Sequence, residues 1–312
     1  MINFNEKYLN YRGHYELLSH PISNTWEIKY LKYKKKYINL KNKMQNKHVT
    51  IHKSLNLSFE ENTYKQLIDT FKSNIVQKIN IMSGGASVPN SQVRYIIEGN
   101  IGSGKTTLTE LLGKYENVEI ILEALDKWEV PIEETNLLKT FYSDTKRNSF
   151  LFEIVCLYTT AMNYLTKQNE FIRFCERSIW SVLNVFVKLL KNDKLLTPLE
   201  AYYIDDFFNW IEKMLPKPNG IFYVRCNPEI SLKRINIRKR PGEEGIKLDL
   251  INKIHNAHEE WFCNWTKETE KDHPPIYIID NDKDDNFDVV IDQIFKFLGF
   301  STPKIKKIKK VF

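Results

Sequence analysis

The chain has 312 residues, of which 42% are hydrophobic, 13% aromatic and 27% charged. This composition is typical of a folded protein with a sizeable core, and it excludes fibrous and wholly disordered classes. No apolar run approaches the roughly 18 residues that a transmembrane helix needs, and the first residues lack the apolar centre of a signal peptide. The four cysteines include no CxxC pair. This argues against a disulfide framework or a cysteine zinc site and favours a reducing compartment such as the cytoplasm.

The net charge of +7 is distributed unevenly along the chain. Residues 1–94 contain 15 Lys and Arg against 6 Asp and Glu, whereas residues 95–302 have a net charge of −7 and the last ten residues add five lysines. Basic ends favour polyanions such as nucleic acid or acidic membranes, but lysine-rich segments more often serve only to keep a chain soluble. The sequence therefore predicts a weak polyanion contact at most, through the N-terminal arm.

Two helices are expected in the basic arm. The segment 26–45 places aromatic and aliphatic residues at alternating spacings of four and three, which predicts a helix with one apolar stripe. A second helix is predicted from about 58 to 80, with Ser58 as its N-cap. The segment 83–92 is rich in Gly, Ser, Pro and Asn, as linkers are. The predicted organisation is therefore a basic extension (1–90), one globular domain (91–302) and a basic tail (303–312).

From residue 93 onward, short apolar runs alternate with longer helical patterns, which is typical of a parallel sheet covered on both faces. Strands are predicted at 93–98, 118–123, 170–175, 220–225 and 275–280. Helices are predicted at about 105–114, 147–168, 179–192, 198–215, 228–239, 247–266 and 285–298. The fold class is therefore α/β, with a doubly wound, five-stranded parallel sheet.

The first predicted strand leads into a segment that matches GxxxxGK[ST], the phosphate-binding loop. Its glycines let the backbone turn back and aim N–H groups at phosphate oxygens, and the following helix adds the positive end of its dipole. Lys105 would supply a cation for the outer phosphates, and Thr106 a hydroxyl for Mg²⁺. The loop consists of Gly99, Asn100, Ile101, Gly102, Ser103, Gly104, Lys105, Thr106 and Thr107.

Two acidic residues, Glu123 and Glu176, stand at or just after the ends of the second and third predicted strands, and Arg177 follows directly. Ligands bind at the carboxyl ends of the strands in such folds. One carboxylate could take Mg²⁺ while the other takes the proton of an acceptor hydroxyl. This arrangement suits a kinase for a small alcohol better than a hydrolase.

Four segments resemble, in order and spacing, the motifs of the deoxynucleoside kinase family. They are GNIGSGKTT at 99–107, EALDKW at 123–128, ERSI at 176–179 and RKRPGEE at 238–244. The resemblance spans roughly residues 93–298 and implies a P-loop kinase fold. It also implies phosphorylation of the 5′-hydroxyl of deoxynucleosides in nucleotide salvage, with ATP as donor, Mg²⁺ as cofactor and a homodimer as the assembly.

The resemblance implies a role for each matching residue. Glu123 would accept the proton of the nucleoside 5′-hydroxyl, Arg177 would hold the 5′ region and the transferring phosphoryl group, and Glu176 would help to position Mg²⁺. A lid over the phosphates would carry three arginines, Arg234, Arg238 and Arg240. The substrate pocket would use Tyr142 and Glu243 for the sugar 3′-hydroxyl, and Trp128, Phe152 and Phe186 for the base.

Two positions depart from the family pattern, Ala124 where proline is usual and Glu153 where glutamine is usual. Glutamine offers one donor and one acceptor, which pair with thymine or cytosine, whereas an ionised glutamate only accepts and fits the two donors of guanine. One hypothesis is that Glu153 shifts the preference from thymidine toward deoxyguanosine or, less well, deoxycytidine. The alternative is that burial raises the pKa of Glu153 until it is protonated and imitates glutamine.

Other origins and functions fit parts of the sequence. The lysine- and tyrosine-rich arm resembles N-terminal segments of proteins from large DNA viruses, which predicts a viral origin and a location in the host cytoplasm. A nucleoside-monophosphate kinase would need extra basic groups for its acceptor phosphate. A decayed kinase domain could serve as a nucleic-acid or virion-associated binding protein, but the intact set of Lys105, Glu123 and Arg177 argues against decay.

Overall fold

The computed structural model describes residues 59–83, 92–240, 243–267, 273–282 and 287–306. The predicted helix at 26–45 and the predicted domain boundary near residue 90 lie outside these ranges. In the described part of the chain, no helix has both the length and the hydropathy that crossing a membrane requires.

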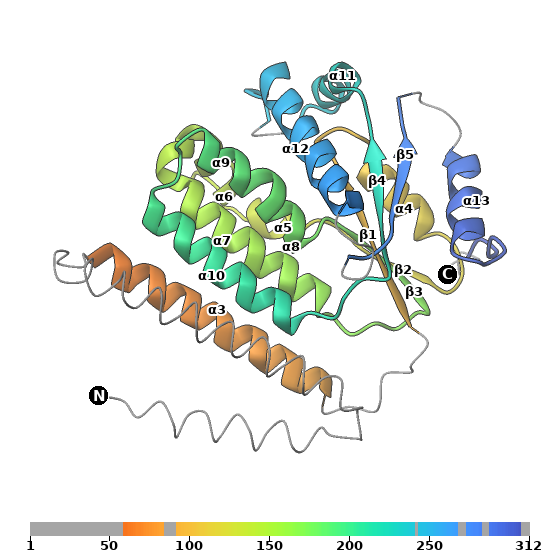
Figure 1. Ribbon diagram of the computed structural model, residues 1–312, viewed down its shortest axis with the longest axis horizontal. Helices are drawn as coiled ribbons and strands as arrows, with labels where there is room; N and C mark the ends of the chain where they lie inside the picture. Colours follow the sequence, from red (N-terminus) through yellow and green to blue (C-terminus); the bar gives the residue numbers. More distant parts are fainter. Residues whose placement is uncertain (1–58, 84–91, 241–242, 268–272, 283–286, 307–312) are drawn as a thin grey trace. The chain divides into compact units, whose positions relative to one another are not determined.

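Within the described residues, five parallel strands form one sheet in the order β2-β3-β1-β4-β5 (Figure 1). The strands are β1 Val93–Gly99, β2 Val118–Ile121, β3 Ile172–Glu176, β4 Gly220–Arg225 and β5 Ile276–Asp280. All five predicted strands are confirmed, and the mostly apolar sequences of the three central strands follow from burial of both faces of the sheet. The central strand β1 pairs with β3 on one side and with β4 on the other. The loop after β1 therefore opens at the middle of the sheet's carboxyl edge.

Alternate residues of the central strands face two separate cores. In β1, Ile96 joins one cluster of buried residues, whereas Tyr95 and Ile97 join the other. In β4, Tyr223 and Phe222 divide between the two clusters in the same way. The period of two along a strand thus gives each face of the sheet its own set of packed side chains.

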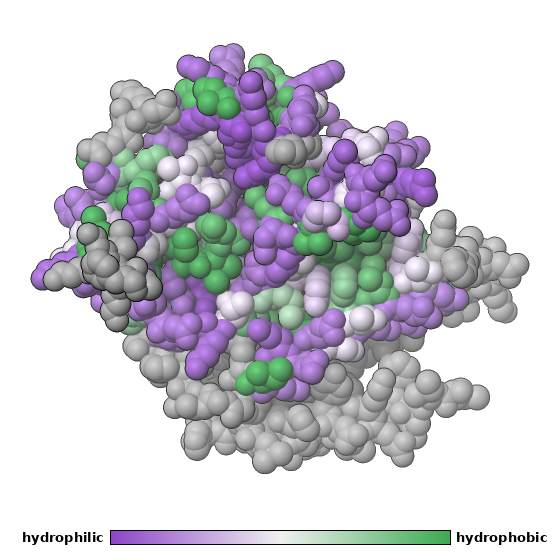
Figure 2. Space-filling view, turned by 180° about the vertical axis from the view of Figure 1, so that it is seen from behind, coloured by the Kyte–Doolittle hydropathy of each residue, from purple (hydrophilic) through white to green (hydrophobic). Residues whose placement is uncertain are grey.

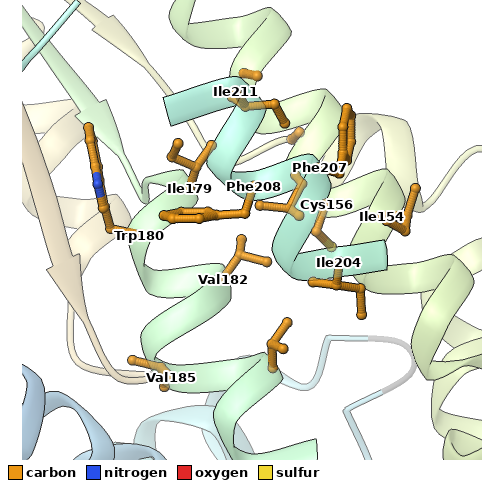
Figure 3. Packing of buried hydrophobic residues seen from close by; sticks show 14 of the residues in the cluster. Ile154, Cys156, Ile179, Trp180, Val182, Val185, Ile204, Phe207, Phe208 and Ile211 are labelled. Carbon is orange, nitrogen blue, oxygen red and sulfur yellow. The ribbon is translucent and has the colours of Figure 1, made fainter. Parts of the chain in front are cut away.

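Helices cover both faces of the sheet. One face packs against α4 (Lys105–Leu112) and α13 (Phe287–Phe297). The larger core on the other face is built with α7 (Thr145–Tyr164), α8 (Ile179–Ser181), η1 (Val182–Val187), α9 (Lys188–Asn192), α10 (Pro198–Met214) and α12 (Leu248–Lys267). Figure 3 shows side chains of α10, among them Phe208 and Ile211, packed against Ile179 and Val182 of the neighbouring helical segment.

The remaining helices are α11 (Pro228–Arg238) and two short ones that the sequence analysis missed, α5 (Leu125–Trp128) and α6 (Leu137–Ser143). The helix predicted at 179–192 was expected to be regular, but its middle part, η1, is a π-helix. Such segments insert an extra residue into a helical turn and occur often at functional sites.

The second predicted helix is confirmed as α3, Phe59–Ser83. Two of its apolar residues, Ile68 and Ile75, are 3% and 0% exposed and belong to the larger core. Although the sequence assigned this helix to the basic extension, its apolar face therefore shares a core with the helices of the predicted kinase domain.

A buried arginine joins β3 to the end of α7. The side chain of Arg173 is 1% exposed and forms an ion pair with Glu119 of β2, with 2.6 Å between nitrogen and oxygen. It also donates hydrogen bonds to three backbone carbonyl groups that follow or end α7, those of Tyr164, Thr166 and Lys167. The guanidinium thus caps a helix C-terminus, where positive charge is favourable.

We expect Arg173→Met to lower the free energy of unfolding by about 3–5 kcal/mol, because it leaves a partly buried carboxylate and several carbonyls without their partner. Urea denaturation measures this loss. The matched control is Arg147→Met, since the side chain of Arg147 is exposed and its loss should change stability by less than about 0.5 kcal/mol. Equal effects of the two substitutions would contradict this account.

Candidate functional site

The loop between β1 and α4 has the backbone geometry of a phosphate cradle. Gly99 and Gly102 have φ angles of 150° and 76°, which side chains of L-residues rarely allow. A Cβ atom would lie 2.4 Å from the carbonyl oxygen of Val224 at Gly99, and 2.5 Å from that of Ser231 at Gly102. Glycine is therefore required at both positions, by conformation and by close packing against β4 and α11.

The lysine and the threonine of this loop have different hydrogen-bond partners. Lys105 Nζ donates a hydrogen bond to the carbonyl oxygen of Asn100 over 2.7 Å. Burial and the nearby Arg177 lower the pKa of Lys105 to about 8. Thr106 Oγ1 donates to the carboxylate of Glu176 over 2.8 Å. A cation and a hydroxyl–carboxylate pair thus flank the place where the loop would hold phosphates.

Arg177 connects the loop with the second strand and with the π-helix. Its Nε donates to Glu123 Oε1 over 2.7 Å, and another guanidinium nitrogen donates to the carbonyl oxygen of Gly99 over 3.1 Å. The guanidinium carbon lies 4.8 Å from the ring centre of Phe186, a cation–π contact. Arg177 has φ of 66°, and such strained conformations cluster at functional sites.

The two strand-end carboxyl groups have opposite pKa shifts. Burial alone would raise the pKa of Glu123, but Arg177 and Lys105 outweigh it and hold this pKa below its ordinary value. Burial and the neighbouring charge of Glu123 raise the pKa of Glu176. Carboxyl groups whose environments separate their pKa values are suited to different chemical roles. Glu123, whose pKa is lowered, is ionised at neutral pH.

A third carboxyl group, Glu98, was missed by the sequence analysis. It is 0% exposed, accepts a hydrogen bond of 2.5 Å from Ser178 Oγ, and lies 3.9 Å from a guanidinium nitrogen of Arg177. Burial raises its pKa to about 7. The signal for it was present in the sequence: an acid inside the apolar run VRYIIEG needs a buried partner.

The predicted base-binding aromatics Trp128, Phe152 and Phe186 all belong to or pack on the larger core. Phe152 packs edge-on against Trp128, with ring centres 5.6 Å apart, and stacks on Phe141 at 4.3 Å. The third predicted aromatic, Phe186, lies beneath the guanidinium of Arg177. Phe141, which the sequence analysis missed because its helix was missed, completes the aromatic cluster around Phe152.

Glu153 follows Phe152 on α7 and is 3% exposed. Burial raises the pKa of Glu153 to about 8, although Arg177 acts in the opposite direction. Among the described residues no side chain donates a hydrogen bond to its carboxyl group. A group with this pKa is mostly protonated at neutral pH, and it then has one hydrogen to donate and one carbonyl oxygen that accepts.

Two of the three predicted lid arginines converge on a single acid. Arg238 donates to both oxygens of Glu243, over 2.7 and 2.8 Å, and Arg240 donates to the same carboxylate over 3.3 Å. Burial and, after it, the charge of Glu243 raise the pKa of Tyr142. Arg234 points elsewhere and donates to the carbonyl oxygen of Asn281 after β5 over 3.0 Å.

A cavity of 730 Å³ opens next to the loop, at the carboxyl ends of β4 and β5. Asn281, one of its lining residues, donates a hydrogen bond to the carbonyl oxygen of Ser103 over 2.7 Å. The residues that line it are Arg225, Asn227, Pro228, His255, Glu259, Asp280, Asn281, Asp282 and Val290. This volume is in the range of small-molecule binding sites.

Comparisons with known proteins agree with the family resemblance that the sequence motifs indicated, over most of the chain. Residues 95–298 match the model of the family described as deoxynucleoside kinase. Deoxycytidine kinase of Bos taurus is 30% identical over 248 residues, covering 70% of this chain and 95% of the relative. Human mitochondrial thymidine kinase 2 is 32% identical over 166 residues, covering 53% and 62%. A protein of fowlpox virus named as a probable deoxycytidine kinase is 28% identical over 191 residues, covering 60% and 78%.

The raised pKa of Glu153 predicts a pH-dependent stability. An ordinary glutamate titrates near 4.5 and the buried one at about 8, so between these values the folded chain binds a proton that the unfolded chain has lost. Stability should therefore fall as pH rises from 5 to 8, by about 1.4 kcal/mol per pH unit for this group, and level off above.

The measurement is the difference in unfolding free energy between the native sequence and Glu153→Gln at a series of pH values. Glu134→Gln is the control, because Glu134 is exposed. Stability curves of the native sequence and Glu153→Gln that run parallel from pH 5 to 8 would show that Glu153 titrates normally.

Proposed function

Because this chain belongs to the deoxynucleoside kinase family, we propose that it transfers the γ-phosphoryl group of ATP to the 5′-hydroxyl of a deoxynucleoside, with Mg²⁺ as cofactor. As a member of this family, the chain is an enzyme that phosphorylates deoxynucleosides with a nucleotide as donor. The observation that carries the finer proposal is the guanidinium of Arg177. It spans from Glu123 to the carbonyl oxygen of Gly99, where the phosphate cradle begins.

The contacts of Arg177 with both ends of the site position the two reactants. The donor phosphates lie on the loop N–H groups beside Lys105, and the acceptor hydroxyl lies at Glu123. Arg177 touches both places, so one rigid group sets the distance between the two reactants. Holding two reactants in line supplies a large part of the catalysis of phosphoryl transfer.

Glu123 acts as the general base. Its Oε1 accepts a hydrogen bond from Arg177, and its other oxygen is available to the 5′-hydroxyl. Its lowered pKa keeps it ionised at neutral pH, so it can accept the hydroxyl proton as the bond to phosphorus forms. The guanidinium that lowers this pKa also faces the charge that spreads over the transferring group.

Thr106 and Glu176 are suited to hold Mg²⁺. A hydroxyl and a carboxylate oxygen that already lie 2.8 Å apart are hard oxygen ligands of the kind that Mg²⁺ prefers. When bound, the ion neutralises charge on the donor phosphates. The role of these two residues is to orient oxygen ligands next to the cradle.

The lid arginines and the sugar site share one acid. Donor phosphates compete with Glu243 for the guanidinium groups of Arg238 and Arg240, which bind Glu243 in this structure, and draw them away from it. Glu243 is then free, together with Tyr142, for the sugar 3′-hydroxyl. Binding of the donor thereby prepares the acceptor site. Guanidinium groups placed over the phosphates stabilise the transition state where water is excluded.

The donor nucleoside fits the 730 Å³ cavity next to the loop. The cavity lies at the ends of β4 and β5, next to the place where the loop would hold phosphates. Asp280 and Asp282 in its lining offer acceptors for an exocyclic amino group. These features support a purine triphosphate such as ATP as the donor.

For the base, we favour the neutral form of Glu153 over the ionised one. A protonated acid donates one hydrogen bond and accepts one, as an amide does, and therefore pairs with thymine or cytosine. The burial of Glu153 supports this form at neutral pH. Pyrimidine deoxynucleosides are accordingly the preferred substrates, and the deoxyguanosine preference of an ionised glutamate applies only above about pH 8.

Several expectations from the sequence stay predictions. They are the viral origin, with which the fowlpox relative agrees, the host-cytoplasm location, the homodimer and the polyanion contact of the arm. The relatives named above do not favour a nucleoside-monophosphate kinase or a decayed binding protein.

We expect Glu123→Gln to reduce kcat by about 10²–10⁴-fold, because the amide keeps a hydrogen bond to Arg177 but cannot accept a proton. Binding of the deoxynucleoside, measured by calorimetry, should change little. Glu134→Gln serves as the control and should retain full turnover. A kcat within tenfold of the native value would remove Glu123 from the role of base.

We expect the ratio of kcat/KM for thymidine to that for deoxyguanosine to fall by roughly ten- to hundredfold between pH 6.5 and 9, as Glu153 loses its donor. Glu153→Gln should abolish this change, because the amide does not titrate. The ratio cancels any group that affects both substrates alike. A ratio that is independent of pH in the native enzyme would refute the neutral-acid account while leaving the kinase assignment intact.

A further inference from the structure

Glu98 is a fully buried acid that none of the proposed reaction steps uses. On the face opposite to that of Figure 1, hydrophobic residues lie in separate patches among hydrophilic ones (Figure 2), and such a surface is where acidic side chains normally lie. Glu98 instead stands near the end of the central strand β1 and is 0% exposed. A carboxyl group is almost never buried to this extent without partners, so its partners indicate what it does.

The partners of Glu98 are the two residues that follow β3. Its Oε1 accepts a hydrogen bond of 2.5 Å from Ser178 Oγ, and its Oε2 lies 3.9 Å from Nη1 of Arg177. Within the described part of the chain, no group donates a hydrogen bond to this Oε2. One oxygen of Glu98 is thus engaged, and the other faces the guanidinium with its acceptor capacity unused.

The contacts of Glu98 support a strained turn. Arg177 has φ of 66°, in the left-handed region that residues other than glycine rarely adopt. Its backbone N–H donates to the carbonyl oxygen of Ile97 over 3.0 Å, and the side chain of Ser178 caps α8 by accepting from the N–H of Ser181. Glu98 therefore connects β1 with both residues of the turn. Such a conformation persists only where the surrounding structure fixes it.

Glu98 and Glu123 contact the guanidinium of Arg177 from different depths. The side chain of Glu123 is 15% exposed and accepts from Nε, whereas Glu98 is fully buried beside Nη1. The same Nη1 donates to the carbonyl oxygen of Gly99, where the phosphate cradle begins. When Glu123 takes up a proton it loses its charge, but the charge of an ionised Glu98 is unaffected. Glu98 then remains as a partner of the guanidinium on the buried side.

The charge of Glu98 depends on pH. Burial raises its pKa to about 7, although Arg177, the hydroxyl of Ser178 and the charge of Lys105 act in the opposite direction. Of these groups, Arg177 approaches from the turn after β3 and Lys105 belongs to the start of α4. The ion pair between Glu98 and Arg177 is therefore present above about pH 7 and is lost as the pH falls through this value.

We infer that Glu98 is a positioning residue for phosphoryl transfer, which holds the guanidinium of Arg177 at the phosphate cradle while Glu123 takes up the proton of the acceptor. This inference rests on the proposed function. In that reaction the 5′-oxygen bonds to the γ-phosphorus and its proton passes to Glu123. The bond from phosphorus to the bridging oxygen breaks, and its electron pair stays on the released diphosphate. The ion pair of Arg177 with Glu123 then loses one charge, and Glu98 keeps the guanidinium in place.

The experiment compares Glu98→Gln with Glu119→Gln in the full-length protein. Glu119 is the matched control, because its carboxylate also pairs with a buried arginine, Arg173, near the opposite end of β3. At pH 8.5, Glu98→Gln should lower kcat by about 10–100-fold, since a small misplacement of a positioning group has an effect of this size. Binding of the deoxynucleoside, measured by calorimetry, should change little. Glu119→Gln should retain the native kcat.

The ratio of the native kcat to that of Glu98→Gln distinguishes positioning from a structural role. It should approach one at about pH 5, where the native Glu98 is protonated and uncharged like the amide, and rise to about 10–100 by pH 8.5. Groups that both proteins share, such as Glu153 and Lys105, cancel in this ratio. Glu98→Asp, which can ionise, should restore part of the activity at pH 8.5.

If Glu98→Gln does not fold, Ser178→Ala provides a second test. It removes a hydrogen bond that favours the ionised form of Glu98, so the pH at which kcat is half-maximal on the acidic side should rise by roughly one unit. An unchanged midpoint, a ratio that does not vary with pH, or an equal loss of kcat in Glu119→Gln would overturn the inference and leave the kinase assignment intact. A native protein that phosphorylates no deoxynucleoside would instead refute the proposed function.

Discussion

The site depends on one buried guanidinium. Arg177 is 6% exposed and is surrounded by the carboxylate of Glu123, the carboxyl group of Glu98, the carbonyl oxygen of Gly99 and the ring of Phe186. Burying a charge is costly unless opposite charge and hydrogen bonds compensate it, and here the compensation comes from three different segments of the chain. The positive charge of Arg177 lowers the pKa of Glu123, whereas burial raises the pKa of Glu98 to about 7. Removing this side chain would therefore change several protonation states at once.

Two further acids of the candidate site, Glu243 and Glu153, depend on their surroundings in a similar way. Glu243 neutralises Arg238 and Arg240 in the structure and is also the acid that the resemblance assigns to the sugar. Glu153 shows that a residue type does not by itself fix a chemical role. Exposed, it would be a permanent acceptor, but in its buried position on α7 it holds a proton and presents the hydrogen-bonding pattern of an amide. The environment, rather than the side chain alone, decides which hydrogen bonds Glu153 can make.

The helix α7, which carries Glu153, is packed on two sides. α7 carries Phe152 and Glu153 toward the aromatic cluster on one side and Phe150 and Tyr158 toward α3 on the other. A helix from outside the family match is thus packed against the helix that carries Phe152 and Glu153. The helix α3 is therefore connected to the candidate site through α7, and it also packs on α10.

Much of the architecture could be predicted from the sequence, because the relevant signals are local. Apolar runs predicted all five strands, the spacing of glycines and Lys105 located the loop, and acids at or beside the strand ends marked the edge where Glu123 and Glu176 lie. Only the tertiary structure decided matters that depend on residues distant in the sequence. It placed Phe186 under Arg177, revealed Glu98 as a partner of Ser178 eighty residues away, and packed α3 on α7 and α10. Burial, protonation and side-chain partners arise from such long-range contacts, and local sequence patterns do not contain them.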